Sequence, residues 1–174
     1  FTSFVSNKIK QGKLNAELEI YLDNNNLFTN FIARGSVANL KTEVIRDLDL
    51  YKINFNFFAD KTDVLIKNFS GETSFVAIKD GDIKLEFSPE ISLKSNFKTK
   101  IKYNQKSINK KNSIRNFDYV KNIVSLEADL DNYFLINFDK TYKLKEYTYK
   151  SDGKIIKEDL NFKKILKNNF LDKK

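Results

Sequence analysis

The chain has 174 residues, a formal net charge of +8, and no Cys, His or Trp. The absence of Cys and His excludes the usual zinc sites and every nucleophilic dyad that needs either residue. Carboxylate-pair chemistry, Ser–Lys chemistry and calcium bound by oxygen ligands remain. Lys supplies nearly all of the positive charge and alternates along the chain without clustering, which is typical of a solvated face.

The chain begins with Phe1 and contains no Met. A complete translation product normally begins with Met, so we expect a segment of a longer protein. We expect residues 1–174 to form a single segment of one domain. In such a segment, the lack of a signal peptide says nothing about the location of the protein. No apolar run approaches the roughly 20 residues of a membrane-spanning helix.

Apolar and polar residues alternate along most of the chain, which predicts β-strands with one apolar and one polar face. The first two regular segments are 13–22 and 27–38, joined by an Asp/Asn turn at 23–26. A shorter and less regular run covers 39–47. The longest alternating stretch is 47–103, with turns predicted at 60–63, 70–71, 80–81 and 88–89.

Asp80-Gly81 lies between two apolar runs and predicts a hairpin, because a type I′ turn needs positive φ at both central residues. The sequence does not decide which side chains of the segment 73–79 lie on the apolar face. Phe75 and Ala77 would lie on one side of the strand, and Val76 and Ile78 on the other.

The segment 105–116 is polar and basic and predicts a loop. Strands resume near residue 118 and continue to 162, with a turn predicted at 151–153. The tail 163–174 fits either a short helix or a frayed strand. Together the segments predict an all-β chain of nine to eleven strands in a sequential antiparallel meander.

No predicted helix is long enough to cover the apolar face of these strands. A second sheet would make a sandwich, closure would make a barrel, and a bound lipid would leave an open groove. The residues alone leave these three alternatives open.

A resemblance to a known family favours the groove. The phrases FIARGSVANL (31–40), LDLYKINFNFFADKTDVLIKNFSGE (48–72) and FVAIKDGDIKLEF (75–87) resemble recurring strands of the AsmA-like superfamily of bacterial envelope proteins, which includes TamB-type and YhdP-type members. The segment 142–156 has a similar sequence pattern. The resemblance covers most of the chain outside 105–116 and the tail.

The resemblance implies an elongated, twisted antiparallel meander that forms an open U-shaped groove. It implies a segment of a bridge-like periplasmic protein of Gram-negative bacteria that carries phospholipid between the inner and outer membranes without catalysis or a cofactor. The protein would be anchored to the inner membrane through a part not present in this sequence. The residues expected to contact acyl chains are Leu18, Ile20, Phe31, Ile53, Phe55, Phe57, Ile83, Leu85, Phe87, Leu93, Phe97 and Ile101.

The main alternative is a structural β-protein, either a fragment of an outer-membrane barrel or a surface adhesin repeat. Transmembrane strands alternate in the same way, but a barrel carries its aromatic residues in girdles at the strand ends. Phe55, Phe57 and Phe97 are expected in the middle of strands, which counts against girdles.

Three further functions have weaker support. The acidic segments at 60–63, 80–82 and 129–132 lack the spacing of an EF-hand loop, and each lies where a turn is expected, so we expect no metal site. A glycosidase pair could be drawn only from the polar faces, where Glu17, Glu19, Glu86 and Glu90 lie, and we expect no enzyme. Nucleic acid is not expected, because aromatic residues and lysines occupy opposite faces.

Overall fold

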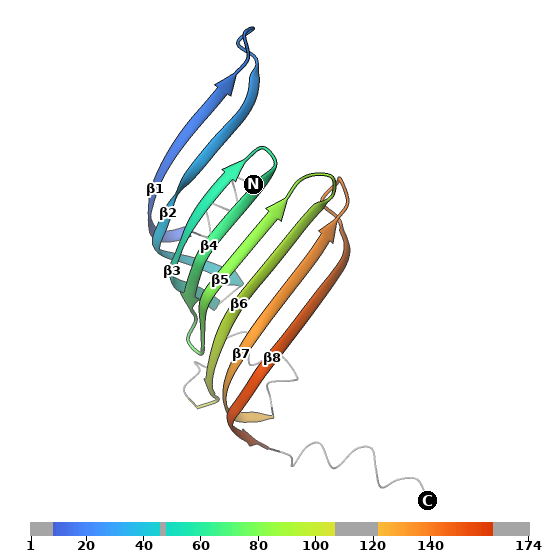
Figure 1. Ribbon diagram of the computed structural model, residues 1–174. Helices are drawn as coiled ribbons and strands as arrows, with labels where there is room; N and C mark the ends of the chain where they lie inside the picture. Colours follow the sequence, from blue (N-terminus) through green and yellow to red (C-terminus); the bar gives the residue numbers. More distant parts are fainter. Residues whose placement is uncertain (1–8, 46–47, 107–121, 162–174) are drawn as a thin grey trace, which may run out of the picture.

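The computed structural model describes residues 9–45, 48–106 and 122–161. They form one sheet of eight strands, each antiparallel to the next and arranged in sequence order (Figure 1). The strands are β1 (Ile9–Leu22), β2 (Phe28–Ile45), β3 (Leu48–Asp60), β4 (Asp63–Glu72), β5 (Val76–Glu86), β6 (Ile91–Asn104), β7 (Ile123–Phe138) and β8 (Leu144–Leu160). The predicted all-β antiparallel meander is therefore confirmed. The sheet is open, because β1 and β8 do not pair with each other.

The register gathers most of the apolar residues of the eight strands on one face. Directly paired residues of neighbouring strands share a face, and the pairing follows the apolar alternation from strand to strand. One row of paired residues crosses the whole sheet and is entirely apolar: Leu18, Ala33, Ala59, Val64, Leu85, Leu93, Ile136 and Tyr147. The register also decides the orientation of the segment 73–79, which the sequence left undecided. Val76 pairs with Ile101 and Ile78 with Thr99, so Val76 and Ile78 lie on the apolar face.

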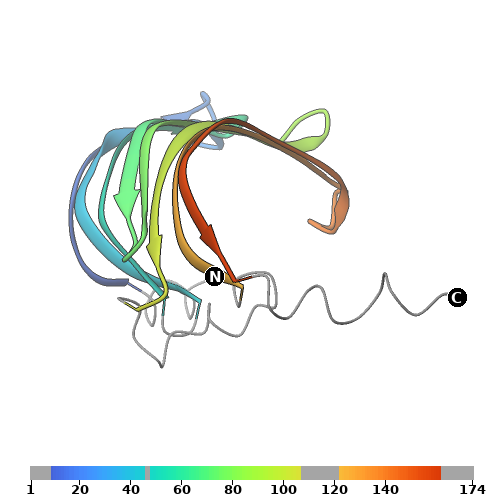
Figure 2. The same ribbon diagram turned by 90° about the horizontal axis from the view of Figure 1, so that it is seen from below.

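The strands bend together, so that the sheet forms an arch when viewed end-on (Figure 2). Side chains converge on the concave side of a curved sheet and diverge on the convex side. The least exposed side chains, including Ile53 at 3% and Ala128 at 2%, belong to the apolar face, although no described element packs over it. We therefore assign the apolar face to the concave side, and we call the two sides the inner and the outer face.

A row of β-bulges accompanies this bend. Asn39, Lys52, Asn68 and Asp80 have φ between 51° and 56°, and each lies at a shift of register in one of the strands β2 to β5. The bulges lie side by side, since the Asn39 amide donates to Oδ1 of Asn54, which belongs to the next bulged strand. A bulge bends its strand and increases the local twist, so four aligned bulges explain the curvature.

Four predicted turns are wrong, because they lie inside strands. Ser70-Gly71 lies within β4, Asp80-Gly81 is the bulge of β5, residues 129–132 lie within β7, and Ser151-Asp152-Gly153 lies in the middle of β8. A residue that tolerates positive φ serves a bulge as well as a turn. Because these strands continue through the predicted turns, the described part has eight strands in place of the nine to eleven expected.

The turns at residues 23–26, 60–63 and 88–89 are confirmed. In two hairpins the same Asp-Lys-Thr sequence closes the turn: Oδ1 of Asp60 accepts from the amide and hydroxyl of Thr62 at 2.6 Å, and Oδ1 of Asp139 accepts from those of Thr141 at 2.7 Å. These bonds stabilise the turn conformation.

Two further predictions fall largely on residues outside the described part. The basic loop predicted at 105–116 is described only at Gln105 and Lys106, which form a turn after β6. The tail at 163–174, where a helix or a frayed strand was expected, lies entirely outside the described residues.

Candidate functional site

The inner face presents a continuous apolar surface across the sheet. Next to the row that begins at Leu18 runs a second row, which is apolar except at one serine: Ala16, Gly35, Phe57, Ile66, Ile83, Ser95, Phe134 and Tyr149. Aromatic rings contact one another in this row and beside it. The Phe55 ring lies 6.5 Å from Phe57 and 6.2 Å from Phe69, and Phe134 lies 5.8 Å from Tyr149 between ring centroids.

This surface is only partly shielded from solvent. Ile53, Ile91, Tyr103 and Ala128 are the buried apolar residues of the described part, and no large side chain there is fully buried. Exposure rises toward the two edges of the sheet, where Leu18 is 63% and Tyr147 66% exposed. An ordinary dry core would bury most of these side chains, so the described residues leave apolar area of the inner face uncovered.

The structure brings together the residues that the resemblance singled out. Eleven of the twelve lie within strands on the inner face: Leu18, Ile20, Phe31, Ile53, Phe55, Phe57, Ile83, Leu85, Leu93, Phe97 and Ile101. Phe87 follows the end of β5, where its amide donates to the carbonyl of Thr62. Whether these side chains contact lipid stays a prediction.

Sequence reasoning missed the contribution of β4, β7 and β8 to this face. Val64 and Ile66 in β4, Phe134 and Ile136 in β7, and Tyr147 in β8 complete the apolar rows. A signal for the β7 residues was present, because Phe134, Ile136 and Phe138 alternate with Tyr133, Leu135 and Asn137. The alternation alone did not tell which of these two sets shares a face with Phe97.

A polar group interrupts the apolar surface over β6 to β8. Asn132 is only 5% exposed, and its Nδ2 donates to the Phe97 carbonyl, the Leu130 carbonyl and Oγ1 of Thr99 at 3.1–3.3 Å. Its Oδ1 accepts from the hydroxyls of Tyr149 at 2.8 Å and Ser151 at 3.0 Å. Asn132 thus joins three strands through side-chain bonds, in an environment where an unpaired amide would be costly.

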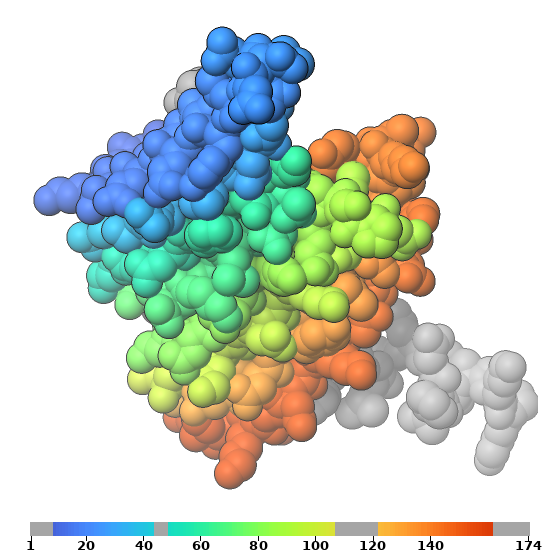
Figure 3. All heavy atoms as spheres, turned by 45° about the horizontal axis from the view of Figure 1, so that its top comes forward, coloured from blue at the N-terminus to red at the C-terminus, as the bar shows by residue number. Residues whose placement is uncertain are grey.

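The outer face is a network of ion pairs between neighbouring strands, and the space-filling view shows those strands as successive bands (Figure 3). Arg34 pairs with Glu17 and Glu19, Lys67 with Asp82, and Lys52 with Glu72. Pairs as exposed as these contribute little to stability, so their main effect is to keep the outer face hydrated.

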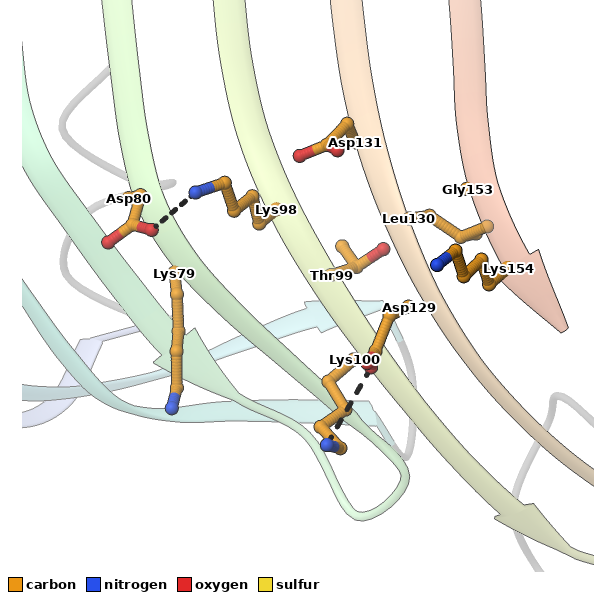
Figure 4. Close-up of a pocket in the computed structure, with 10 residues that line it drawn as sticks. All are labelled: Lys79, Asp80, Lys98, Thr99, Lys100, Asp129, Leu130, Asp131, Gly153 and Lys154. Carbon is orange, nitrogen blue, oxygen red and sulfur yellow. Dashed lines mark hydrogen bonds and ion pairs between the residues drawn. The ribbon is translucent and has the colours of Figure 1, made fainter. Parts of the chain in front are cut away.

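A shallow pocket of about 400 Å³ lies over β5 to β8 on the outer face. Figure 4 shows two ion pairs in it, Lys98 with Asp80 at 3.1 Å and Lys100 with Asp129 at 3.8 Å. The hydrogen bond from Lys98 to Asp80 raises the pKa of this lysine, so its amine stays protonated at neutral pH. A protonated amine cannot act as a general base, and we assign no reaction to this pocket.

The carboxylates considered for catalysis are held by cations. Glu17 and Glu19 bind Arg34, Glu86 binds Lys84 at 2.8 Å, and Glu90 lies 3.3 Å from Lys145. In the described part of the chain, no group of three or more acidic residues is placed to hold a metal ion. Asp60, a candidate calcium ligand, uses its oxygen within its own turn.

Comparison with family models, with curated proteins and with solved structures gives no match. Over residues 9–45, 48–106 and 122–161, no helix is long and apolar enough to cross a membrane. Any functional argument therefore depends on the inner face itself.

Proposed function

We propose that the inner face binds the acyl chains of phospholipid and that the chain is a lipid-carrying segment of an AsmA-like bridge protein. In this proposal the segment lies in the periplasm, and lipid moves along it between the inner and outer membranes without catalysis. The supporting observation is the apolar row from Leu18 to Tyr147, which crosses all eight strands and which no described element covers. The family assignment rests on the resemblance alone.

The dimensions suit an acyl chain. Eight strands have seven spacings of about 4.8 Å, so the row is roughly 34 Å long. Removing one methylene group from water contributes about 0.8 kcal/mol, and this contribution has no directional requirement. A continuous apolar row therefore binds a hydrocarbon chain at many positions of similar energy, which permits the chain to slide.

The distribution of charge supports the same function. The lysines and carboxylates of these ion pairs lie on the outer face, and the two apolar rows of the inner face carry no charged residue. Acyl chains would meet no charged group on these rows, and the outer face would keep the segment hydrated.

Native mass spectrometry with lipid extraction tests this function on the protein purified from a bacterial host. We expect co-purified phospholipid, and we expect its loss when Phe55 and Phe97 on the inner face are replaced by Asp. Phe58→Asp is the matched control, because Phe58 lies in the same strand as Phe55 but pairs with Arg34 and Leu65 on the outer face.

Leu18→Asp and Tyr147→Asp separate loss of binding from loss of folding. Both residues end the apolar row and are more than half exposed, so replacement removes little packing. A folded wild-type protein that carries no lipid would contradict the proposal and would favour a structural role with the inner face covered by protein.

A further inference from the structure

Five polar residues form a cluster on the inner face between the apolar rows. Ser95 and Thr99 come from β6, Asn132 from β7, and Tyr149 and Ser151 from β8. They occupy three consecutive rows of paired residues. In the first row, Ser95 and Tyr149 both pair with Phe134. In the second, Phe97 and Ser151 pair with Asn132, and in the third, Thr99 pairs with Leu130. We call these five residues the polar cluster.

Asn132 is fully used inside this cluster, but two of the hydroxyls are not. Ser95 is 6% exposed, and among the described residues no group exchanges a hydrogen bond with its hydroxyl. Thr99 accepts a bond from Asn132, and no described group accepts the proton of its own hydroxyl. A buried hydroxyl without a partner costs about 1–3 kcal/mol, which makes the absence of a partner for Ser95 informative.

The surroundings select the kind of group that could accept these protons. On the inner face, the direct neighbours of Ser95 and Thr99 are apolar: Ile83, Phe134, Ile78 and Leu130. The nearby charges, such as Lys98, Lys100 and Asp131, alternate onto the outer face. A carboxylate or phosphate here would lie without a counter-charge, so the matching ligand group is a neutral acceptor without a proton of its own.

We propose that Ser95 and Thr99 bind ester carbonyl oxygens of an acylglycerol lipid, whose chains lie on the adjacent apolar rows. This inference rests on the proposed function. The two are donors from one strand, four residues apart, and at roughly 13 Å along the strand they form two separate sites for a carbonyl group. Phe97 and Phe134 flank Ser95. Phe134 contacts the ring of Tyr149, whereas no described element covers the Phe97 ring, which can move aside for the ligand.

The test is a competition between two lipids of equal chain length. Dioleoylglycerol carries two ester carbonyls, and its dioleyl ether analogue carries none. Both are offered in equal amounts to the purified chain, and the bound ratio is read by native mass spectrometry. We expect the wild-type protein to prefer the ester by about fivefold to tenfold, the equivalent of one or two hydrogen bonds.

The variant Ser95→Ala/Thr99→Val removes both donors with little change of shape, and we expect it to bind the two lipids equally. Thr99→Ser keeps a hydroxyl and should retain the preference. The matched control is Ser36→Ala/Thr148→Val, which makes the same two changes on the outer face of β2 and β8.

The outcomes separate the two proposals. If the wild-type protein binds ester and ether equally, or if the double variant keeps the preference, the carbonyl site is wrong and the acyl-binding face stands. If neither lipid binds to the folded protein, the proposed function fails and the carbonyl site fails with it.

Discussion

The hydroxyl of Tyr149 in β8 donates a 2.8 Å hydrogen bond to Oδ1 of Asn132 in β7, and Nδ2 of Asn132 continues the connection to Thr99 in β6. The bonds lie on the apolar inner face, where water competes less than on the outer face. A buried amide of this kind favours one register over its neighbours, because a slip by one residue would leave it unpaired.

Asn132→Ala should lower the free energy of unfolding by about 2 kcal/mol, because the substitution removes both ends of this connection. The urea midpoint of the purified protein measures the change. Asn137→Ala is the control in the same strand: Asn137 donates to Glu146 on the outer face, and its loss should cost less than about 0.5 kcal/mol. Equal losses from the two variants would contradict the importance of the inner-face bonds.

Ser95→Ala should leave the ligand-free protein as stable as the wild type or raise its free energy of unfolding by up to about 1 kcal/mol. The reason is that the buried Ser95 hydroxyl has no partner among the described residues, so its removal relieves a desolvation penalty. Ser36→Ala on the outer face is the comparison, with an expected change within about 0.5 kcal/mol. A clear destabilisation by Ser95→Ala in urea unfolding would mean that the hydroxyl is bonded within the free protein.

The bulges depend on close backbone approach at glycine. A Cβ atom at Gly81 would lie 2.9 Å from Cβ of Phe69 and 3.0 Å from its carbonyl oxygen. Gly81→Ala should therefore destabilise the protein by about 1–3 kcal/mol. Gly71→Ala should cost less, because the nearest atom is a side-chain carbon of Ile53 at 3.3 Å, which can move. Thermal unfolding of the two variants would refute this account if Gly71→Ala were the more damaging.

The sequence predicts the two faces well and the connections between strands less well. Alternation placed Phe55, Phe57 and Phe97 correctly on one face, because the period of two is a property of every strand. Asp80-Gly81 was misassigned, because the backbone freedom that permits a hairpin also permits a bulge. Ser95 and Asn132 could not be recognised as neighbours, since their rows exist only once the register of β6 against β7 is known.

Two turn carboxylates make stability depend on acid pH. Hydrogen bonds from Thr62 and Thr141 lower the pKa values of Asp60 and Asp139 below the ordinary value of 3.8. A carboxyl with a lowered folded pKa stabilises the protein above its unfolded pKa. That stabilisation is lost as the pH falls below about 4 and through the folded value.

Urea unfolding between pH 5 and pH 2.5 measures this dependence. Asp60→Ala/Asp139→Ala should lose less stability than the wild type over the same range, because its turns no longer contain the titrating groups. Ser36→Ala, on the outer face of β2, removes no titrating group, and as the control it should follow the wild type. A double variant with the wild-type pH dependence would show that other groups govern the acid transition.

The most direct test of the acyl-binding face is paramagnetic broadening of methyl resonances by a phospholipid with a nitroxide on its acyl chain. Ile83 and Leu93 report on the inner face, and Ile32 and Leu65 report on the outer face of the same sheet. We expect the nitroxide lipid to broaden the methyl signals of Ile83 and Leu93 clearly more than those of Ile32 and Leu65, which lie farther from it across the sheet. Equal broadening of both pairs, or none at all in the folded protein, would contradict binding of lipid to the inner face.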